Sequence, residues 1–187
     1  DELPHLRARA LWLLGKMPQR GMHYVEVATE DADPRIRILA LRLARQVADV
    51  DEVEIARRLC NDDNPQVRRE CAIALRYQTD PKAAKIWATL AQQHDGQDRW
   101  YLEALGIGAD RQWDSFLNAY LAQQPSVCDT PAARQIIWRS RSTQTPELLV
   151  QILTSPQTPA DEIPRYLRAF DFLDGDQREK ALVDLAF

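Results

Sequence analysis

The chain has 187 residues, 45% of them hydrophobic and 28% charged, with 6 glycines and a formal net charge of -4. This length suits one domain with a buried core, and the few glycines and many charges are typical of a helix-rich protein. No apolar run approaches the roughly 20 residues that cross a bilayer, so we expect no membrane insertion. The negative net charge disfavours a protein whose main task is to neutralise nucleic-acid phosphates.

The first predicted elements are three copies of one helical motif. Residues 33–44 and 64–75 share, position by position, a capping residue, a proline, a β-branched residue, an arginine and a small residue. Residues 4–14 repeat the pattern with Leu3 in place of the polar cap. Such self-similarity at a period of 20 to 50 residues indicates a repeat architecture.

Downstream the motif fades but its spacing persists. The small or apolar centres of the copies are Ala10, Ala40, Cys71, Ala104, Ile137 and Ala169, with steps of 30, 31, 33, 33 and 32 residues. In the fourth copy Tyr101 stands where the arginine was, and Arg134 restores the arginine in the fifth.

Each period also contains a second amphipathic stretch with apolar residues three and four apart, as in a helix that buries one face. These stretches are residues 24–28, 53–60, 83–91, 113–121, 148–153 and 178–185. Capping residues before proline predict helix starts at Asp33, Asn64, Asp80, Thr130, Thr145 and Thr158. We therefore predict one all-α domain over residues 1–187, a right-handed α–α superhelix of about six helical hairpins with the first entered halfway.

A period of about 31 residues with Asp or Asn, Pro, an apolar residue, Arg and then Ala resembles the HEAT-repeat consensus. HEAT proteins carry a ladder of aspartates and arginines along the stack. The resemblance implies a structural ladder that matches Asp31 or Asp33 with Arg37, and Asp62 or Asp63 with Arg68. We take Asp33, Arg37, Asp63 and Arg68 as its members, because arginine binds carboxylates and carbonyls in a bidentate manner.

Residues 10–15 and 98–108, ALWLLG and DRWYLEALGIG, resemble the HEAT segment of large exported bacterial proteins of the membrane-bound dehydrogenase type. In that family a β-propeller precedes the segment and a c-type haem-binding domain follows it. The resemblance implies an exported or periplasmic protein in which this chain connects the two modules and carries no redox group itself. The start at Asp1, without a signal segment, agrees with a fragment of a larger protein.

The best candidate for a contact surface lies at the start of the fourth copy. Trp100 and Tyr101 are adjacent and cannot both face the core of one helix, so we expect one of them at the surface. With Arg99 and Glu103 they form the predicted contact surface for a protein partner or another domain of the same chain. For Trp12 and Trp138 we expect core packing instead.

No catalytic constellation is apparent. His5, His23 and His94 are unpaired in the sequence, and neither a nucleophile motif nor a glycine-rich phosphate loop occurs. We therefore predict no catalytic residue, no metal and no cofactor, and a monomeric scaffold that binds protein.

The alternative is a nucleic-acid-binding or DNA glycosylase-type module, for which arginines of the second helices would form a basic strip. Interleaved acidic residues favour salt bridges over such a strip. A surface in which carboxylates neutralise Arg9, Arg42, Arg69 and Arg134 would count against the alternative.

Overall fold

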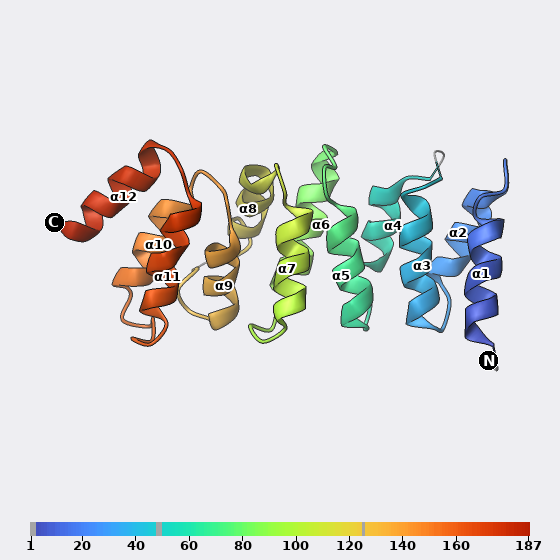
Figure 1. The fold of residues 1–187 in the computed structure, drawn as a ribbon, viewed down its shortest axis with the longest axis horizontal. Helices are drawn as coiled ribbons and strands as arrows, with labels where there is room; N and C mark the ends of the chain where they lie inside the picture. Colours follow the sequence, from blue (N-terminus) through green and yellow to red (C-terminus); the bar gives the residue numbers. More distant parts are fainter. Residues whose placement is uncertain (1–2, 48–49, 125) are drawn as a thin grey trace.

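The computed structural model describes residues 3–47, 50–124 and 126–187, and in these residues it contains helices and no strand (Figure 1). The helices form two layers. One layer holds α1 (Pro4–Leu14), α3 (Pro34–Ala44), α5 (Pro65–Ala74), α7 (Arg99–Gly108), α9 (Pro131–Arg139) and α11 (Ile163–Ala169). The other holds α2 (Gly21–Thr29), α4 (Glu52–Leu59), α6 (Pro81–Gln92), α8 (Trp113–Leu121), α10 (Thr145–Thr154) and α12 (Asp176–Ala186). A short 3-10 helix, η1 (Phe170–Phe172), follows α11.

Within each layer neighbouring helices pack side by side, except α8 and α10, which make little contact, and the two termini lie at opposite ends of the stack (Figure 1). Among neighbours in the chain, α2 packs on α3 and α4 packs on α5. The first helix, α1, packs on both α2 and α3, in the position that the second helix of a hairpin has in the later repeats. The protein is an all-α helical-repeat solenoid, which confirms the predicted fold class.

The core runs along the stack between the two layers, as expected where each hairpin buries its apolar face against its neighbours. Trp87 is fully buried, and its indole N–H donates to the carbonyl of Leu105 at 2.9 Å. Three aromatic rings of α8 surround it, those of Trp113, Phe116 and Tyr120. Outside this centre, Trp12 and Trp138 are half-buried and pack against the core.

Four of the predicted helix starts are confirmed by side-chain caps. The side chains of Asp33, Asn64, Asp80 and Thr130 accept a hydrogen bond from the first turn of α3, α5, α6 and α9. Each such cap contributes about 1 kcal/mol to the stability of its helix.

The predicted caps at Thr145 and Thr158 are wrong. Thr145 is the first residue of α10, and its hydroxyl donates to Ser140 Oγ at 2.8 Å. Thr158 does not directly precede a helix, since α11 begins only at Ile163. Its hydroxyl instead donates to the carbonyl of Ile152, near the end of α10, at 2.6 Å. Both hydroxyls are therefore used in the interior of the fold.

The arginine–aspartate ladder exists, but its carboxylates differ from the predicted ones. Arg37 pairs with Asp62 of the following turn through its Nε at 2.6 Å and its Nη2 at 2.8 Å. Asp33 instead caps α3 and pairs with Arg35. Asp63 contributes only its backbone carbonyl, to Arg68 at 3.1 Å. The assignment of Asp33 and Asp63 to the ladder is wrong.

The ladder follows one geometry along the chain. Arg37, Arg68 and Arg134 each reach the carbonyl six residues before them, at 2.7, 2.7 and 2.8 Å. Further rungs join Arg7 to Asp31 and Arg134 to Glu162.

Between these rungs, the guanidinium of Arg68 lies 5.7 Å from the centre of the Tyr101 ring, in the repeat where tyrosine replaces arginine. The ladder thus ties neighbouring repeats together on both sides of this change.

Candidate functional site

The structure separates the two adjacent aromatic residues of the predicted contact surface. The Asp98 side chain caps α7 by accepting from the N–H of Tyr101 at 3.0 Å, which sets the phase of the helix. Trp100 is 73% exposed and Tyr101 only 2% exposed, so the prediction that one of them lies at the surface is confirmed. An exposed indole of this kind is uncommon on a soluble protein and marks a surface worth attention.

Tyr101 does not belong to the contact surface. Its hydroxyl donates to the carbonyl of Leu90 at 2.9 Å, and its ring stacks on His94 with the centroids 6.0 Å apart. Burial raises the pKa of Tyr101 to about 12, so its hydroxyl remains protonated at neutral pH. The prediction that Tyr101 belongs to the contact surface is therefore wrong, because Tyr101 lies in the core.

Trp100 lies in a shallow groove of about 330 Å³ between α3, α5 and α7. Its apolar lining comes from Ile38, Ile73 and Ile107 in addition to Trp100. The sequence analysis did not single out these isoleucines. A usable signal was present, since Ile107 follows Trp100 by seven residues and so returns to the same face of the helix.

Most charged residues at this groove are paired, within α7 or across repeats, whereas Arg69 forms no ion pair among the residues described. Arg42 donates to Glu70 at 2.9 Å, and Glu103 accepts from both Arg99 and Arg139 at 2.6 and 2.9 Å. Burial raises the pKa of Glu103, but the two guanidinium groups outweigh it and hold that pKa below its ordinary value. Glu103 is therefore ionised at neutral pH and fixed in place beside the exposed indole.

Residues 21–106 match the family model described as HEAT repeats. The match runs from the first residue of α2 into α7, and therefore contains the pairs α2–α3, α4–α5 and α6–α7. No curated protein and no solved structure matches the chain.

The matched segment ends inside the helix that carries Trp100, and α8 to α12 continue the same two-layered stack beyond it (Figure 1). HEAT repeats act as scaffolds for protein interaction and are generally non-catalytic. The groove around Trp100 lies on the layer that ends with α11, the layer that faces the viewer in Figure 1.

In the described part of the chain, no group of three or more His, Cys, Asp or Glu side chains could hold a metal ion. His94 is buried, with Nε2 3.0 Å from Gln135 Oε1. None of the described helices is long and apolar enough to span a membrane.

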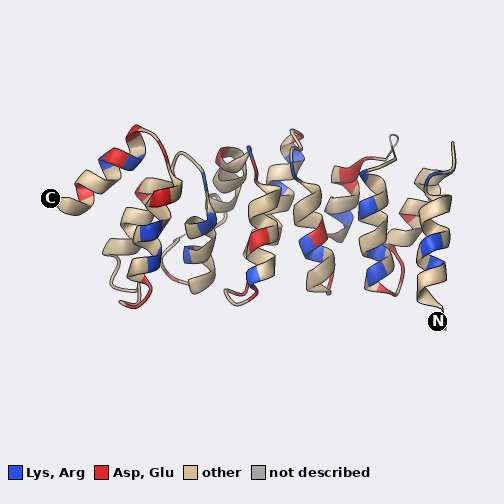
Figure 2. Cartoon of the chain, viewed as in Figure 1, with Lys and Arg blue, Asp and Glu red and all other residues tan. Residues whose placement is uncertain are grey.

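Both signs of charge occur along the stack (Figure 2). Of the four arginines named for the basic strip, Arg42 pairs with Glu70, while Arg134 is 3% exposed and pairs with Glu162. Arg9 and Arg69 have no ion pair among the residues described. Half of the strip is thus neutralised, which weighs against a continuous phosphate-binding face.

Proposed function

We propose that this chain is a non-catalytic scaffold that binds a protein, or another domain of its own chain, through the groove around Trp100. The observation that best supports this proposal is the exposure of Trp100, which is 73% exposed in a groove lined by three isoleucines. Tryptophan, tyrosine and arginine are the residue types enriched among interface positions that carry binding energy. Its exposure in the unbound solenoid leaves a large apolar area for a partner to cover.

The surroundings of the indole fit the anatomy of a protein interface. Arg99 and Glu103 pair beside Trp100, and Arg42 pairs with Glu70 across the groove. An aromatic centre with a hydrated polar rim is the usual arrangement at protein–protein contacts. The fixed ion pairs would set the orientation of the partner rather than supply most of the affinity.

Site-specific photo-crosslinking in the source cells tests this proposal. A photoreactive residue at Ile107, which is 38% exposed in the groove, should give a discrete crosslinked product that Trp100→Ala abolishes. The control is the same residue at Val27, which is 58% exposed on α2 and outside the groove. Identical products from both positions, or products indifferent to Trp100→Ala, would reject the groove as the contact surface.

The resemblance of residues 98–108 supports a finer form of the proposal. In this form the solenoid is a monomeric connector that joins a propeller-type dehydrogenase domain to a cytochrome c-like domain in an exported protein. Reading the open frame on both sides of the chain tests it. A propeller upstream and a Cys-x-x-Cys-His motif downstream are expected, and their absence would remove this form while leaving the scaffold proposal intact.

A further inference from the structure

A second groove, of about 700 Å³, lies beside the first and crosses α7, α9 and α11. Five arginines and one glutamate line it, which gives it a formal charge of +4. The whole chain carries -4, so this concentration of positive charge runs against the composition of the protein. The arginines are Arg99, Arg139, Arg141, Arg165 and Arg168, and the glutamate is Glu103.

Two of these arginines are available to a ligand. Arg139 and Arg99 are paired with Glu103, and Arg141 donates to the last carbonyls of α9. Arg165 and Arg168, by contrast, form no ion pair with any carboxylate of the described residues. They lie one helical turn apart on α11, so their guanidinium groups are neighbours on one face.

The acidic residue nearest to Arg165 in the sequence, the N-cap residue of α11, is already paired. Glu162 accepts from Arg134 at 3.1 Å and from the hydroxyl of Tyr166 at 2.6 Å. It therefore serves the ladder and leaves Arg165 without a bonded carboxylate.

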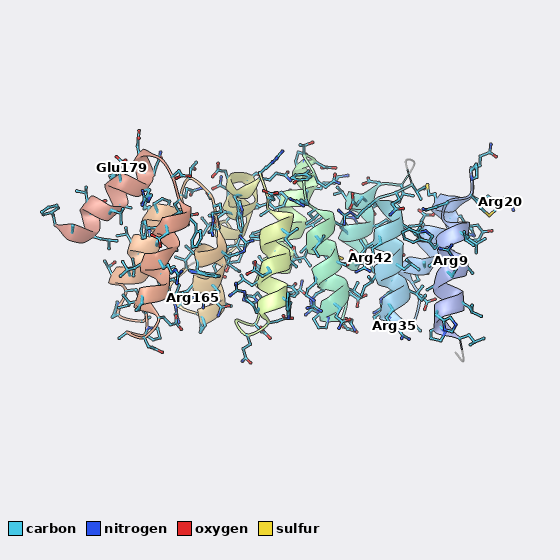
Figure 3. All side chains as sticks on the ribbon, viewed as in Figure 1. Arg9, Arg20, Arg35, Arg42, Arg165 and Glu179 are labelled. Carbon is cyan, nitrogen blue, oxygen red and sulfur yellow. The ribbon has the colours of Figure 1, made fainter. Side chains whose placement is uncertain are left out.

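Aromatic rings hold the guanidinium groups in place. Arg165 lies 4.1 Å and Arg99 5.1 Å from the centre of the Trp138 ring, and Arg141 lies 5.3 Å from that of Phe172. A guanidinium stacked on a ring keeps its N–H edge free for a carboxylate and loses little rotamer entropy on binding. Figure 3 shows Arg165 on the same face of the stack as Arg42 and Arg9.

We propose that this groove, the α7–α9–α11 groove, binds an acidic peptide segment in which carboxylates alternate with apolar side chains. The carboxylates pair with Arg165 and Arg168, and the apolar side chains contact Trp138 and Phe172, which is 56% exposed. The inference deepens the proposed scaffold function by naming the chemistry of a partner, but it uses a different groove from the one around Trp100.

The distribution of charge favours a short acidic peptide over a nucleic acid. A phosphate backbone needs a basic surface that continues over several repeats. The adjoining groove around Trp100 contains two arginines and two glutamates and is therefore neutral. The positive charge thus ends after one groove, and the exposed aromatic surface inside it matches apolar side chains that a phosphate backbone lacks.

Fluorescence anisotropy with a labelled peptide that repeats Glu-Glu-Leu tests the proposal on the full chain. We expect saturable binding that weakens with added salt and is absent for the peptide with Gln in place of Glu. The double variant Arg165→Glu and Arg168→Glu should bind at least about tenfold more weakly, since each lost charge-assisted bond is a large fraction of the affinity.

The matched control is the double variant Arg20→Glu and Arg35→Glu, which changes the net charge equally at the other end of the stack (Figure 3). It should bind the peptide like the parent. If the groove variant fails to fold by circular dichroism, Arg165→Gln with Arg168→Gln replaces it.

Three outcomes would overturn the proposal. They are no saturable peptide binding, equal losses in groove and control variants, and a duplex oligonucleotide that binds more tightly than the peptide with the same arginine dependence. Loss of peptide binding alone would leave the Trp100-dependent crosslinks standing, so the two proposals fail separately.

Discussion

Asp62→Ala should lower the free energy of unfolding by about 2 to 3 kcal/mol. The carboxylate of Asp62 is 7% exposed and accepts from Arg37 at 2.6 and 2.8 Å and from the N–H of Asn64 at 2.9 Å. Removing one partner of a buried pair costs about 3 to 5 kcal/mol. The loss here falls below that range, because Arg37 is 16% exposed and keeps its bond to the carbonyl of Asp31 at 2.7 Å.

Urea unfolding followed by far-UV circular dichroism measures this loss, with Asp63→Ala as the matched neighbour. Asp63 is exposed and its side chain lies outside the ladder, so its replacement should change stability by less than about 0.5 kcal/mol. Asp62→Asn should fall between the two, since the amide oxygen can still accept from Asn64. Equal losses for Asp62→Ala and Asp63→Ala would refute the ladder geometry described above.

Three further predictions concern packing and pH. Gly108→Ala should destabilise the chain by roughly 1 to 3 kcal/mol despite the better helix propensity of alanine, because the added Cβ would lie 2.1 Å from the carbonyl oxygen of Ala72; thermal unfolding measures this, and a stabilised variant would contradict it. Burial raises the pKa of Glu52 to about 7 from 4.5, so its contribution to stability is largest below pH 4.5 and is lost as the pH rises through 7. The free energy of unfolding of Glu52→Gln, measured by urea titration, should therefore rise relative to that of the parent between pH 5 and pH 8. A difference between the two that does not change with pH would exclude Glu52 as the cause. Cys71→Arg places a charge at a fully buried position and should unfold the chain at room temperature; a cooperative transition near that of the parent would show that the repeat register is wrong.

The fold could be predicted where local chemistry and tertiary packing agree. Asp33 and Asn64 precede prolines, and each caps the helix that the repeat predicts there. Thr145 and Thr158 present the same local signal, but their hydroxyls bond to Ser140 and to the carbonyl of Ile152. A Thr-Pro pair cannot reveal which acceptor surrounds its hydroxyl, so these two helix boundaries required the three-dimensional structure.

The sequence predicted which helices carry the ladder and the exposed aromatic residue, but not which side chains take part. The HEAT resemblance placed the ladder at Asp33 and Asp63, and the structure uses Asp31 and Asp62. The Asp33 carboxylate caps its own helix and is not free to reach the next repeat, whereas Asn64, not Asp63, caps α5. Helical geometry required one of Trp100 and Tyr101 to be exposed, and the structure buries Tyr101, whose hydroxyl donates to the carbonyl of Leu90.

The α7–α9–α11 groove shows how one repeat architecture yields two kinds of surface. In the repeats before α7, an arginine of one helix meets a carboxylate of the next, as Arg42 meets Glu70 and Arg37 meets Asp62. These pairs hold neighbouring repeats together and neutralise the arginines that form them. At the start of α11 the ladder still uses the carboxylate of Glu162, but Arg165 and Arg168 form no ion pair among the described residues. The charge of Arg165 and Arg168 is therefore available for recognition, and specificity is expected where the repeat consensus has faded.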